Sequence, residues 1–259
     1  MVAKDRSLQL SFGTLSYRNL WRCLLSTTRQ CSAAVILAGG LGLRLRPFSL
    51  AIPKPLMPVG EKALIETQIS RFVQAGIQNI FIATNYKGDY LQRFLGDGSQ
   101  LGAKIYYSQE STELGTAGPL DLIRDKLPET FFVINGDILS TESISSITDF
   151  HNRAQGDFTV AVKSQSTPYN FGHIVLNAGR VVSIEEKPIL QTNIVAGMYI
   201  LNKSILNFIP IGEKFGMDQL MANLLLKNSV INAYILKDYW IDIGQIDSLS
   251  EAQLFSDLG

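Results

Sequence analysis

Residues 33–47 read AAVILAGGLGLRLRP, a short apolar run followed directly by a glycine-rich loop. The apolar run is typical of a buried strand. Gly39, Gly40 and Gly42 lack the Cβ atoms that would keep backbone N–H groups away from an anion, and Arg44 and Arg46 can add charge-assisted hydrogen bonds to phosphate oxygens. The stretch therefore predicts a strand that ends in a phosphate-binding loop.

Two common phosphate motifs do not fit this loop. The dinucleotide fingerprint needs a glycine at position 45, where Leu45 stands, and no Gly-Lys-Ser/Thr of a P-loop follows. Taken alone, a tight turn with two surface arginines explains the loop equally well. Residues 53–59, PKPLMPV, favour the phosphate interpretation, because prolines on both sides of Lys54 stiffen the backbone that presents its ammonium group.

From residue 33 onward, β-rich runs alternate with segments of helical period. This alternation predicts an α/β fold with a Rossmann-like mixed, mainly parallel sheet flanked by helices. The expected strands are 33–37, 79–84, 104–109, 131–134, 158–163, 194–201 and 234–236, with a hairpin formed by 173–176 and 181–185. Two helices are expected from their apolar faces, one with Ile65, Ile69, Phe72 and Val73 before Gly76 and one with Leu120, Ile123 and Leu127. Three more are expected at residues 204–209, 218–226 and 249–258.

The composition excludes several classes of function. The chain has 259 residues, of which 46% are hydrophobic and 18% charged, so it can bury a full core. Beyond residue 31 there are 18 basic and 22 acidic residues without a basic cluster, so we expect no nucleic acid partner. No apolar run reaches the roughly 20 residues of a membrane span, so we expect no membrane insertion.

Residues 1–32 differ from the rest, since they are rich in Ser, Thr and Arg and poor in acidic residues. Organellar targeting segments share this composition, but an unstructured extension is the favoured interpretation. We therefore expect an N-terminal extension at 1–32 and a single domain at 33–259. Cys23 and Cys31 both lie in the extension, so the core has no disulfide or cysteine metal site, which favours the cytoplasm.

Residues 37–59, LAGGLGLRLRPFSLAIPKPLMPV, resemble the signature of the sugar nucleotidyltransferase family, LAGGxGTRLxP…PKPxxPV. The resemblance covers about Ala33 to Gln253. Further segments that match the family in order are Leu114–Pro119, Asn135–Asp137, Glu185–Pro188, Val195–Tyr199 and Trp240–Gly244. The resemblance implies the nucleotide-diphospho-sugar transferase fold and an enzyme that joins a sugar 1-phosphate to a nucleoside triphosphate and releases pyrophosphate.

The resemblance also implies a role for individual residues. Arg44, Lys54 and Asp137 would be catalytic, and Asp137 with Asp242 would bind Mg²⁺, which prefers carboxylate and phosphate oxygens. The implied nucleotide-binding residues are Leu37, Ala38, Gly39, Gly40, Gly42, Leu43, Glu110, Gly115 and Thr116. The implied sugar-phosphate-binding residues are Gly172, Glu186, Lys187 and Asn193.

Glu110 favours GTP as the nucleotide. It stands where thymine- or uracil-selective members commonly carry Gln, and a carboxylate can accept from both N1–H and N2–H₂ of guanine. Residues 216–220, GMDQL, also resemble guanylyltransferases for mannose, heptose or amino-sugar phosphates. The sugar stays undetermined at this stage.

Structural roles are an alternative interpretation for several of these residues. Asp137 and Asp242 could cap helices, Lys187 could be a solvated hairpin end, and His151 and His173 are expected to be structural.

The sequence departs from the family pattern at two positions, with Leu43 in place of Thr and Val195 in place of Asn. These departures leave the alternative that the protein is a catalytically silent regulatory homologue. A metal-dependent glycosyltransferase is a second alternative, but Asp137-Ile138-Leu139 lacks the Asp-x-Asp of that class. The chain ends at Gly259 without the hexapeptide β-helix of many relatives, so we expect no oligomerisation through such a helix; a homodimer is compatible with the sequence.

Overall fold

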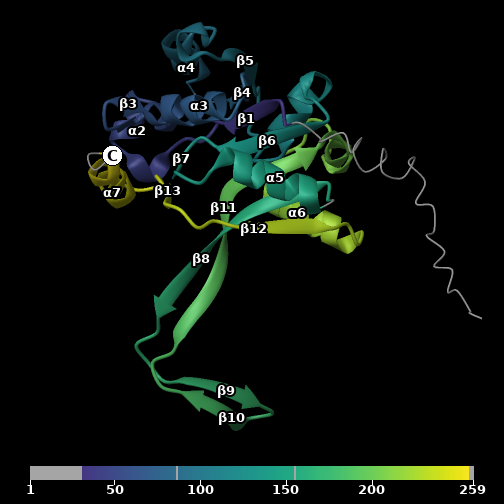
Figure 1. Cartoon of the computed structure of the whole chain (residues 1–259). Helices are drawn as coiled ribbons and strands as arrows, with labels where there is room; N and C mark the ends of the chain where they lie inside the picture. The colour runs from purple at the N-terminus through teal and green to yellow at the C-terminus, as the bar shows by residue number, and fades with distance from the viewer. Residues whose placement is uncertain (1–30, 86, 155, 257–259) are drawn as a thin grey trace, which may run out of the picture. The chain divides into compact units, whose positions relative to one another are not determined.

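The computed structural model describes residues 31–85, 87–154 and 156–256 (Figure 1). The chain divides into two units between Gln30 and Cys31, and the described residues belong to the second unit. Cys31 is buried in the core, two residues before the boundary that the sequence predicts. Ser32 is also described, and residues 1–30 of the predicted extension lie outside the described residues.

A seven-stranded sheet forms the centre of this unit, in the order β12-β8-β11-β6-β1-β4-β5. The pairs β1–β4, β1–β6, β4–β5 and β8–β12 are parallel, whereas β11 runs antiparallel to both β6 and β8. The predicted mixed, mainly parallel sheet is confirmed. Its strands are β1 (Ala33–Leu37), β4 (Asn79–Thr84), β5 (Lys104–Gln109), β6 (Thr130–Asn135), β8 (Phe158–Pro168), β11 (Ile189–Asn202) and β12 (Ile231–Ile235).

Helices cover both faces of the sheet because successive side chains of a strand point to opposite faces. Ala34 and Ile36 of β1 pack in one apolar cluster, and Ala33 and Val35 pack in another. The first cluster contains apolar residues of α3 (Leu64–Gln74), α4 (Gly88–Leu95) and α5 (Ile144–Ala154). The second contains those of η4 (Gly118–Lys126), η5 (Lys203–Phe208) and α6 (Met217–Leu226).

The predicted helices at 120–127 and 204–209 are 3₁₀ helices, η4 and η5. Leu120 and Ile123 lie three residues apart, a spacing that keeps both on one face when there are three residues per turn. The remaining helical segments are α2 (Phe48–Ala51), α7 (Ile246–Ser256), η1 (Leu43–Leu45), η2 (Lys54–Leu56) and η3 (Ser99–Leu101). Among the described residues, no helix has the length and apolar character needed to cross a membrane.

Two small antiparallel sheets were not predicted from the sequence. β2 (Pro58–Val59) pairs with β3 (Lys62–Ala63), and β7 (Ile138–Ser140) pairs with β13 (Trp240–Asp242). Leu139 of β7 and Ile241 of β13 pack in a third apolar cluster with Leu64 of α3. This cluster ties the end of the chain to the segment that follows β6.

Residues 164–193 form an arm, which we define as the outer parts of β8 and β11 together with the hairpin that they carry. β8 and β11 stay paired as far as Pro168 opposite Ile189, beyond the point where their side chains are covered. The hairpin consists of β9 (His173–Asn177) and β10 (Arg180–Glu185), as predicted, and all its residues are exposed. Figure 1 shows β8 and β11 leading away from the sheet to this hairpin.

Candidate active site

A cavity of about 220 Å³ lies at the carboxyl ends of β1, β4 and β6. Ligands of open α/β sheets generally bind at this edge, outside the carboxyl ends of the strands. The predicted nucleotide-binding residues that line the cavity are Leu37, Ala38, Gly39, Gly40, Glu110, Gly115 and Thr116. The predicted catalytic residues Lys54 and Asp137 line it as well. Residues that the sequence places up to about 100 positions apart thus share one site.

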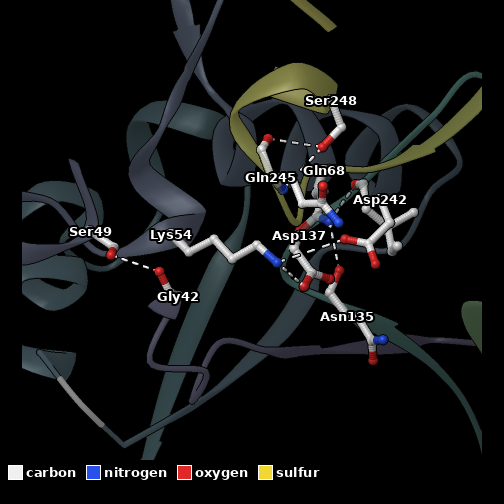
Figure 2. Close-up of polar contacts among 10 residues, drawn as sticks. Gly42, Ser49, Lys54, Gln68, Asn135, Asp137, Asp242, Gln245 and Ser248 are labelled. Carbon is white, nitrogen blue, oxygen red and sulfur yellow. Dashed lines mark hydrogen bonds and ion pairs between the residues drawn. The ribbon is translucent and has the colours of Figure 1, made fainter. Parts of the chain in front are cut away.

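The glycine-rich loop turns sharply at Gly42, whose φ of 60° lies in the left-handed region that glycine adopts readily. The Gly42 carbonyl accepts a hydrogen bond from Ser49 Oγ at 2.7 Å, which closes the loop (Figure 2). η1 follows at once and carries Arg44. Gly42 and the exposed Leu43 are not among the residues that line the cavity, although both were predicted to bind nucleotide.

Arg44 lies beside the predicted metal ligands. A Cβ atom at Gly244 would lie 3.2 Å from Arg44 Nη2 and 3.2 Å from Asp242 Oδ1. The guanidinium group and the Asp242 carboxylate therefore border the same small space. Burial raises the pKa of Asp242, and the positive charge of Arg44 opposes part of this rise.

Lys54 is the central cation of the site. It begins η2 between Pro53 and Pro55, and only 9% of its surface is exposed. Its ammonium group forms an ion pair with Asp137 Oδ2 and lies 3.7 Å from Asp242 Oδ1 (Figure 2). The stiff proline-flanked segment thus directs one buried lysine at two carboxylates.

The β7–β13 pair brings Asp137 and Asp242 together. Asp242 is opposite Ile138 in this pair, and the Ile243 N–H donates to the Asp137 carbonyl at 2.9 Å. Strand β7, not a helix, follows Asp137, and α7 begins four residues after Asp242. The helix-cap interpretation of these two aspartates is therefore wrong.

The two carboxylates place two acidic groups next to each other. Burial raises the pKa of Asp242, and the charge of Asp137 raises it further, against the opposing effects of Lys54 and Arg44. Asp137 Oδ1 is buried without a hydrogen-bond partner in the described part of the chain. A buried, unpaired carboxylate oxygen next to a second carboxylate suits a hard divalent cation.

These residues fit Mg²⁺ but do not form a complete set of ligands. Within residues 31–85, 87–154 and 156–256, no group of three or more His, Cys, Asp or Glu side chains could hold a metal ion. Mg²⁺ is commonly bound through one or two carboxylates together with substrate phosphates and water. Asp137 and Asp242 match that mode of binding.

Glu110 lines the cavity and also closes the loop that follows β5. Its side chain is buried, and Oε2 accepts a hydrogen bond from the Leu114 N–H at 2.8 Å. Burial raises the pKa of Glu110 above its ordinary value, although the hydrogen bonds from Leu114 and Asn85 oppose this shift. The structural part of this role was not predicted from the sequence.

The four predicted sugar-phosphate residues lie on the arm, and none of them lines the cavity. Gly172 and Glu186 are close together, since a Cβ atom at Gly172 would lie 3.0 Å from Glu186 Oε2. Asn193 accepts a hydrogen bond from Ser164 Oγ at 2.7 Å across the β8–β11 pair. Lys187 is exposed at the end of the hairpin and has a positive φ of 49°. Their role stays a prediction.

The structural interpretation of His151 is confirmed. It is buried and forms hydrogen bonds with Thr159 Oγ1 at 2.8 Å and Asn202 Oδ1 at 3.3 Å. His173 is exposed at the start of β9, away from the residues that line the cavity.

Sequence reasoning missed several residues of the site. Pro119, Asn135 and Gly136 line the cavity and lie inside motifs that had been recognised, so their proximity to those motifs was the available signal. Gln68 contacts the turn that carries Asp137, and the signal for it was a polar residue between Ile65 and Ile69 on the apolar face of α3.

Comparisons with known proteins agree with this geometry. The family model described as "Nucleotidyl transferase" matches residues 33–257. Mannose-1-phosphate guanylyltransferase 1 of Arabidopsis thaliana is 37% identical over 221 residues, which cover 82% of this chain and 61% of the relative. The chain thus spans about three fifths of the length of that relative.

Two solved structures share the fold. One is a "Putative Glucose-1-Phosphate Thymidylyltransferase" from Bacillus anthracis, with a TM-score of 0.72 and 26% identity, covering 86% of this chain and 94% of the other. The other is HddC from Yersinia pseudotuberculosis complexed with GMP-PN, with a TM-score of 0.69 and 27% identity, covering 86% of this chain and 99% of the other. Together with the glycine-rich loop and the two aspartates, these matches show that the chain belongs to the nucleotidyltransferase family.

Proposed function

We propose that this protein transfers the GMP part of GTP to a sugar 1-phosphate, giving a nucleotide sugar and pyrophosphate. The observation that carries the proposal is the position of Lys54, held between Asp137 and Asp242 beside the cavity of the glycine-rich loop. Two anionic substrates repel each other, so the reaction requires cationic groups held in place before they bind. The Arabidopsis thaliana relative carries the name of such an enzyme.

We assign each of these residues a role in the proposed reaction. An oxygen of the sugar phosphate attacks the α-phosphorus in line, and the bond from that phosphorus to the bridging oxygen of the β-phosphate breaks, so that pyrophosphate leaves. Lys54 binds the α-phosphate, and Arg44 stabilises the leaving pyrophosphate. The backbone N–H groups near Gly39 and Gly40 orient the phosphates.

A divalent metal ion would be a second source of positive charge. Enzymes of this family generally depend on a divalent metal, and we propose Mg²⁺ held by Asp137 and Asp242. Bound there, it would supply positive charge to the phosphate oxygens. The chain itself contributes the partnerless Oδ1 of Asp137 and the Asp242 carboxylate.

Glu110 supports guanine as the base. Its carboxylate lines the cavity next to Gly39, since a Cβ atom at Gly39 would lie 2.9 Å from Glu110 Oε1. A carboxylate accepts hydrogen bonds only, which matches the two neighbouring donors of guanine. We expect GTP to be used in preference to UTP and dTTP, and efficient turnover of UTP or dTTP with little use of GTP would reject the base assignment.

Mannose 1-phosphate is the first sugar to test, because the Arabidopsis thaliana relative is named for it. We propose that Glu186 and Lys187 hold the sugar phosphate, although neither residue lines the cavity.

We also propose a cytoplasmic homodimer. The free buried thiol of Cys31 suits a reducing compartment. The arm exposes the large apolar residues Ile174, Leu176, Val181, Val182 and Ile184, a patch of the kind that a second chain covers. Sedimentation equilibrium would show a monomer if the homodimer is wrong.

Release of pyrophosphate is the decisive test. The purified chain is mixed with Mg²⁺, each of GTP, UTP, dTTP, CTP and ATP, and mannose, glucose or heptose 1-phosphate, and pyrophosphate is measured with a coupled assay. We expect release with GTP and one sugar phosphate, and loss of turnover in Asp137→Asn with the fold unchanged by circular dichroism. Tight binding of a GDP-sugar without pyrophosphate release would instead indicate the silent regulatory homologue.

A further inference from the structure

Gln68 is a buried polar residue on the otherwise apolar face of α3. Only 4% of its surface is exposed, and its amide nitrogen donates to two carbonyl oxygens, those of Asn135 at 2.9 Å and Ile138 at 2.7 Å. These two carbonyls flank Gly136 and Asp137, so one side-chain amide closes the turn that presents the Asp137 carboxylate (Figure 2). An amide NH₂ has two hydrogens, and each carbonyl can take one of them.

The other end of the Gln68 amide carries an energetic cost. Gln68 Oε1 is buried and has no hydrogen-bond partner within the part of the chain that the structure describes. Burying an unpaired polar atom costs free energy that an apolar side chain of similar volume would not. The two bonds from Nε2 offset that cost and satisfy two backbone carbonyls, which methionine or leucine could not do.

Glu142 makes a matching set of contacts to the strand that carries Asp242. Its buried carboxylate accepts from the Lys237 N–H at 2.7 Å, the Asp238 N–H at 3.0 Å and the Tyr234 hydroxyl at 2.7 Å. Lys237 and Asp238 lie three and two residues before Trp240, where β13 begins. The carboxylate thus fixes the backbone that leads into Asp242.

The same helix connects the two sets of contacts. Arg71, three residues after Gln68 on α3, donates to the carbonyl oxygen of Glu142. Gln68 and Arg71 therefore lie on one side of α3, because residues three apart on a helix are neighbours. Helix α3 holds the turn before β7 with one residue and the segment after β7 with the other.

We propose that Gln68 and Glu142 are positioning residues that set the spacing of the Asp137 and Asp242 carboxylates for a divalent cation. Gln68 fixes the backbone of Asp137, Glu142 fixes the entry to β13, and the β7–β13 pair joins the two. The inference rests on the metal site of the proposed function. It concerns the binding of the ion by this chain, which can be measured apart from turnover.

The test is a Mn²⁺ titration of the full chain followed by electron paramagnetic resonance. Gln68→Met keeps the volume and removes both hydrogen bonds, and Glu142→Gln puts an NH₂ group among N–H donors. Loss of groups that orient metal ligands typically weakens metal binding about 10- to 100-fold, and we expect this range for both variants. Far-ultraviolet circular dichroism should show the wild-type fold.

Two control variants separate positioning from stability. Tyr234→Phe removes the hydroxyl bond to the same carboxylate but leaves both backbone N–H bonds, so Mn²⁺ binding should be unchanged. Ile69→Val removes a buried methyl group from the same helix, so the melting temperature should fall without a change in Mn²⁺ binding. If Gln68→Met lowers only the melting temperature and binds Mn²⁺ like the wild type, the inference is wrong.

The remaining outcomes distinguish this inference from the proposed function. A wild-type chain that binds Mn²⁺ but releases no pyrophosphate would reject the transfer reaction, while weaker binding by Gln68→Met would still support positioning. A wild-type chain that binds no Mn²⁺ with or without GTP would overturn the metal site and this inference together. An active wild type with an unaffected Gln68→Met variant would overturn the inference alone.

Discussion

Replacing Lys54 with methionine removes the ammonium group that separates Asp137 from Asp242. The side chain of Lys54 is only 10% exposed, and its ion pair with Asp137 is closer than the 3.7 Å that separates it from Asp242 Oδ1. At 3.7 Å and an effective dielectric constant of about 20, two unit charges attract by roughly 4 kcal/mol. Since 45% of the Asp242 side chain is exposed, solvent reduces that attraction to about 1 kcal/mol or less.

The pair with Asp137 is better shielded and contributes more. Breaking a buried ion pair by removing one partner typically costs about 3–5 kcal/mol, and the 26% exposure of the Asp137 side chain lowers the expectation to about 2–3 kcal/mol. Lys54→Met should therefore unfold at lower urea concentration in EDTA. Mg²⁺ should restore part of the loss, because it neutralises the same carboxylates.

Lys54→Met should lower turnover but raise the affinity for the metal ion. Loss of one preorganised cationic contact commonly lowers the rate about 10²- to 10³-fold, which the pyrophosphate assay measures. Lys54 also competes with a cation for Asp137, so Lys54→Met should bind Mn²⁺ more tightly while turning over more slowly. Lys62→Met, an exposed lysine on β3, is the matched control and should behave like the wild type. Equal stability of Lys54→Met and wild type in EDTA would refute this reasoning.

Three further predictions concern other parts of the chain. Gly115→Ala should lower the free energy of unfolding, measured in urea, by about 1–3 kcal/mol. The reason is that Gly115 has a φ of +79° and a new Cβ would lie 2.7 Å from the Phe215 carbonyl oxygen. Gly76 has a similar φ but open space around it, so Gly76→Ala should lower the free energy of unfolding by less. Burial alone would raise the pKa of Glu142, but hydrogen bonds from Asp238, Tyr234 and Lys237 and the charge of Lys163 lower it below 4.5. The stability that Glu142 contributes is therefore present above about pH 4.5 and is lost as the pH falls through its lowered pKa. The difference in unfolding free energy between wild type and Glu142→Gln should shrink in acid. Urea unfolding from pH 7 to 3.5 measures this difference. Lys187→Ala should raise the KM for the sugar 1-phosphate while leaving GTP binding, measured by calorimetry, unchanged; an unchanged KM would remove Lys187 from the site.

The strands and the glycine-rich loop could be predicted because their signals are local. In β1, apolar side chains fill both faces of the sheet, so the residues read as one continuous buried run. Lys54 was indicated by its flanking prolines, and the role of Asp137 was implied by the resemblance of Asn135–Asp137 to a motif of the family. The cavity confirms that these motifs meet at one edge of the sheet.

The contacts that arrange the site could not be predicted in the same way. Strands β7 and β13 have only three residues each, too few to show a strand period, and they pair across about 100 positions. In the sequence, Gln68 is simply a polar residue on an apolar helix face, because its hydrogen-bond partners lie about 70 residues away. Glu142 has no motif, since its partners are two backbone N–H groups and a hydroxyl more than 90 residues later.

By itself, the sequence determined the main-sheet strands, the exposed hairpin, the glycine-rich loop and several helices, but not α4, α5 or the short strands β2, β3, β7 and β13. The predicted elements were found because periodicity, glycine and proline act on the chain nearby. Tertiary structure alone decided that Lys54 lies between Asp137 and Asp242, that α3 holds the turn between β6 and β7, and that the arm carries Lys187 away from the cavity. The physical reason is that these arrangements depend on packing and hydrogen bonds between distant segments, whose geometry exists only once the sheet has formed.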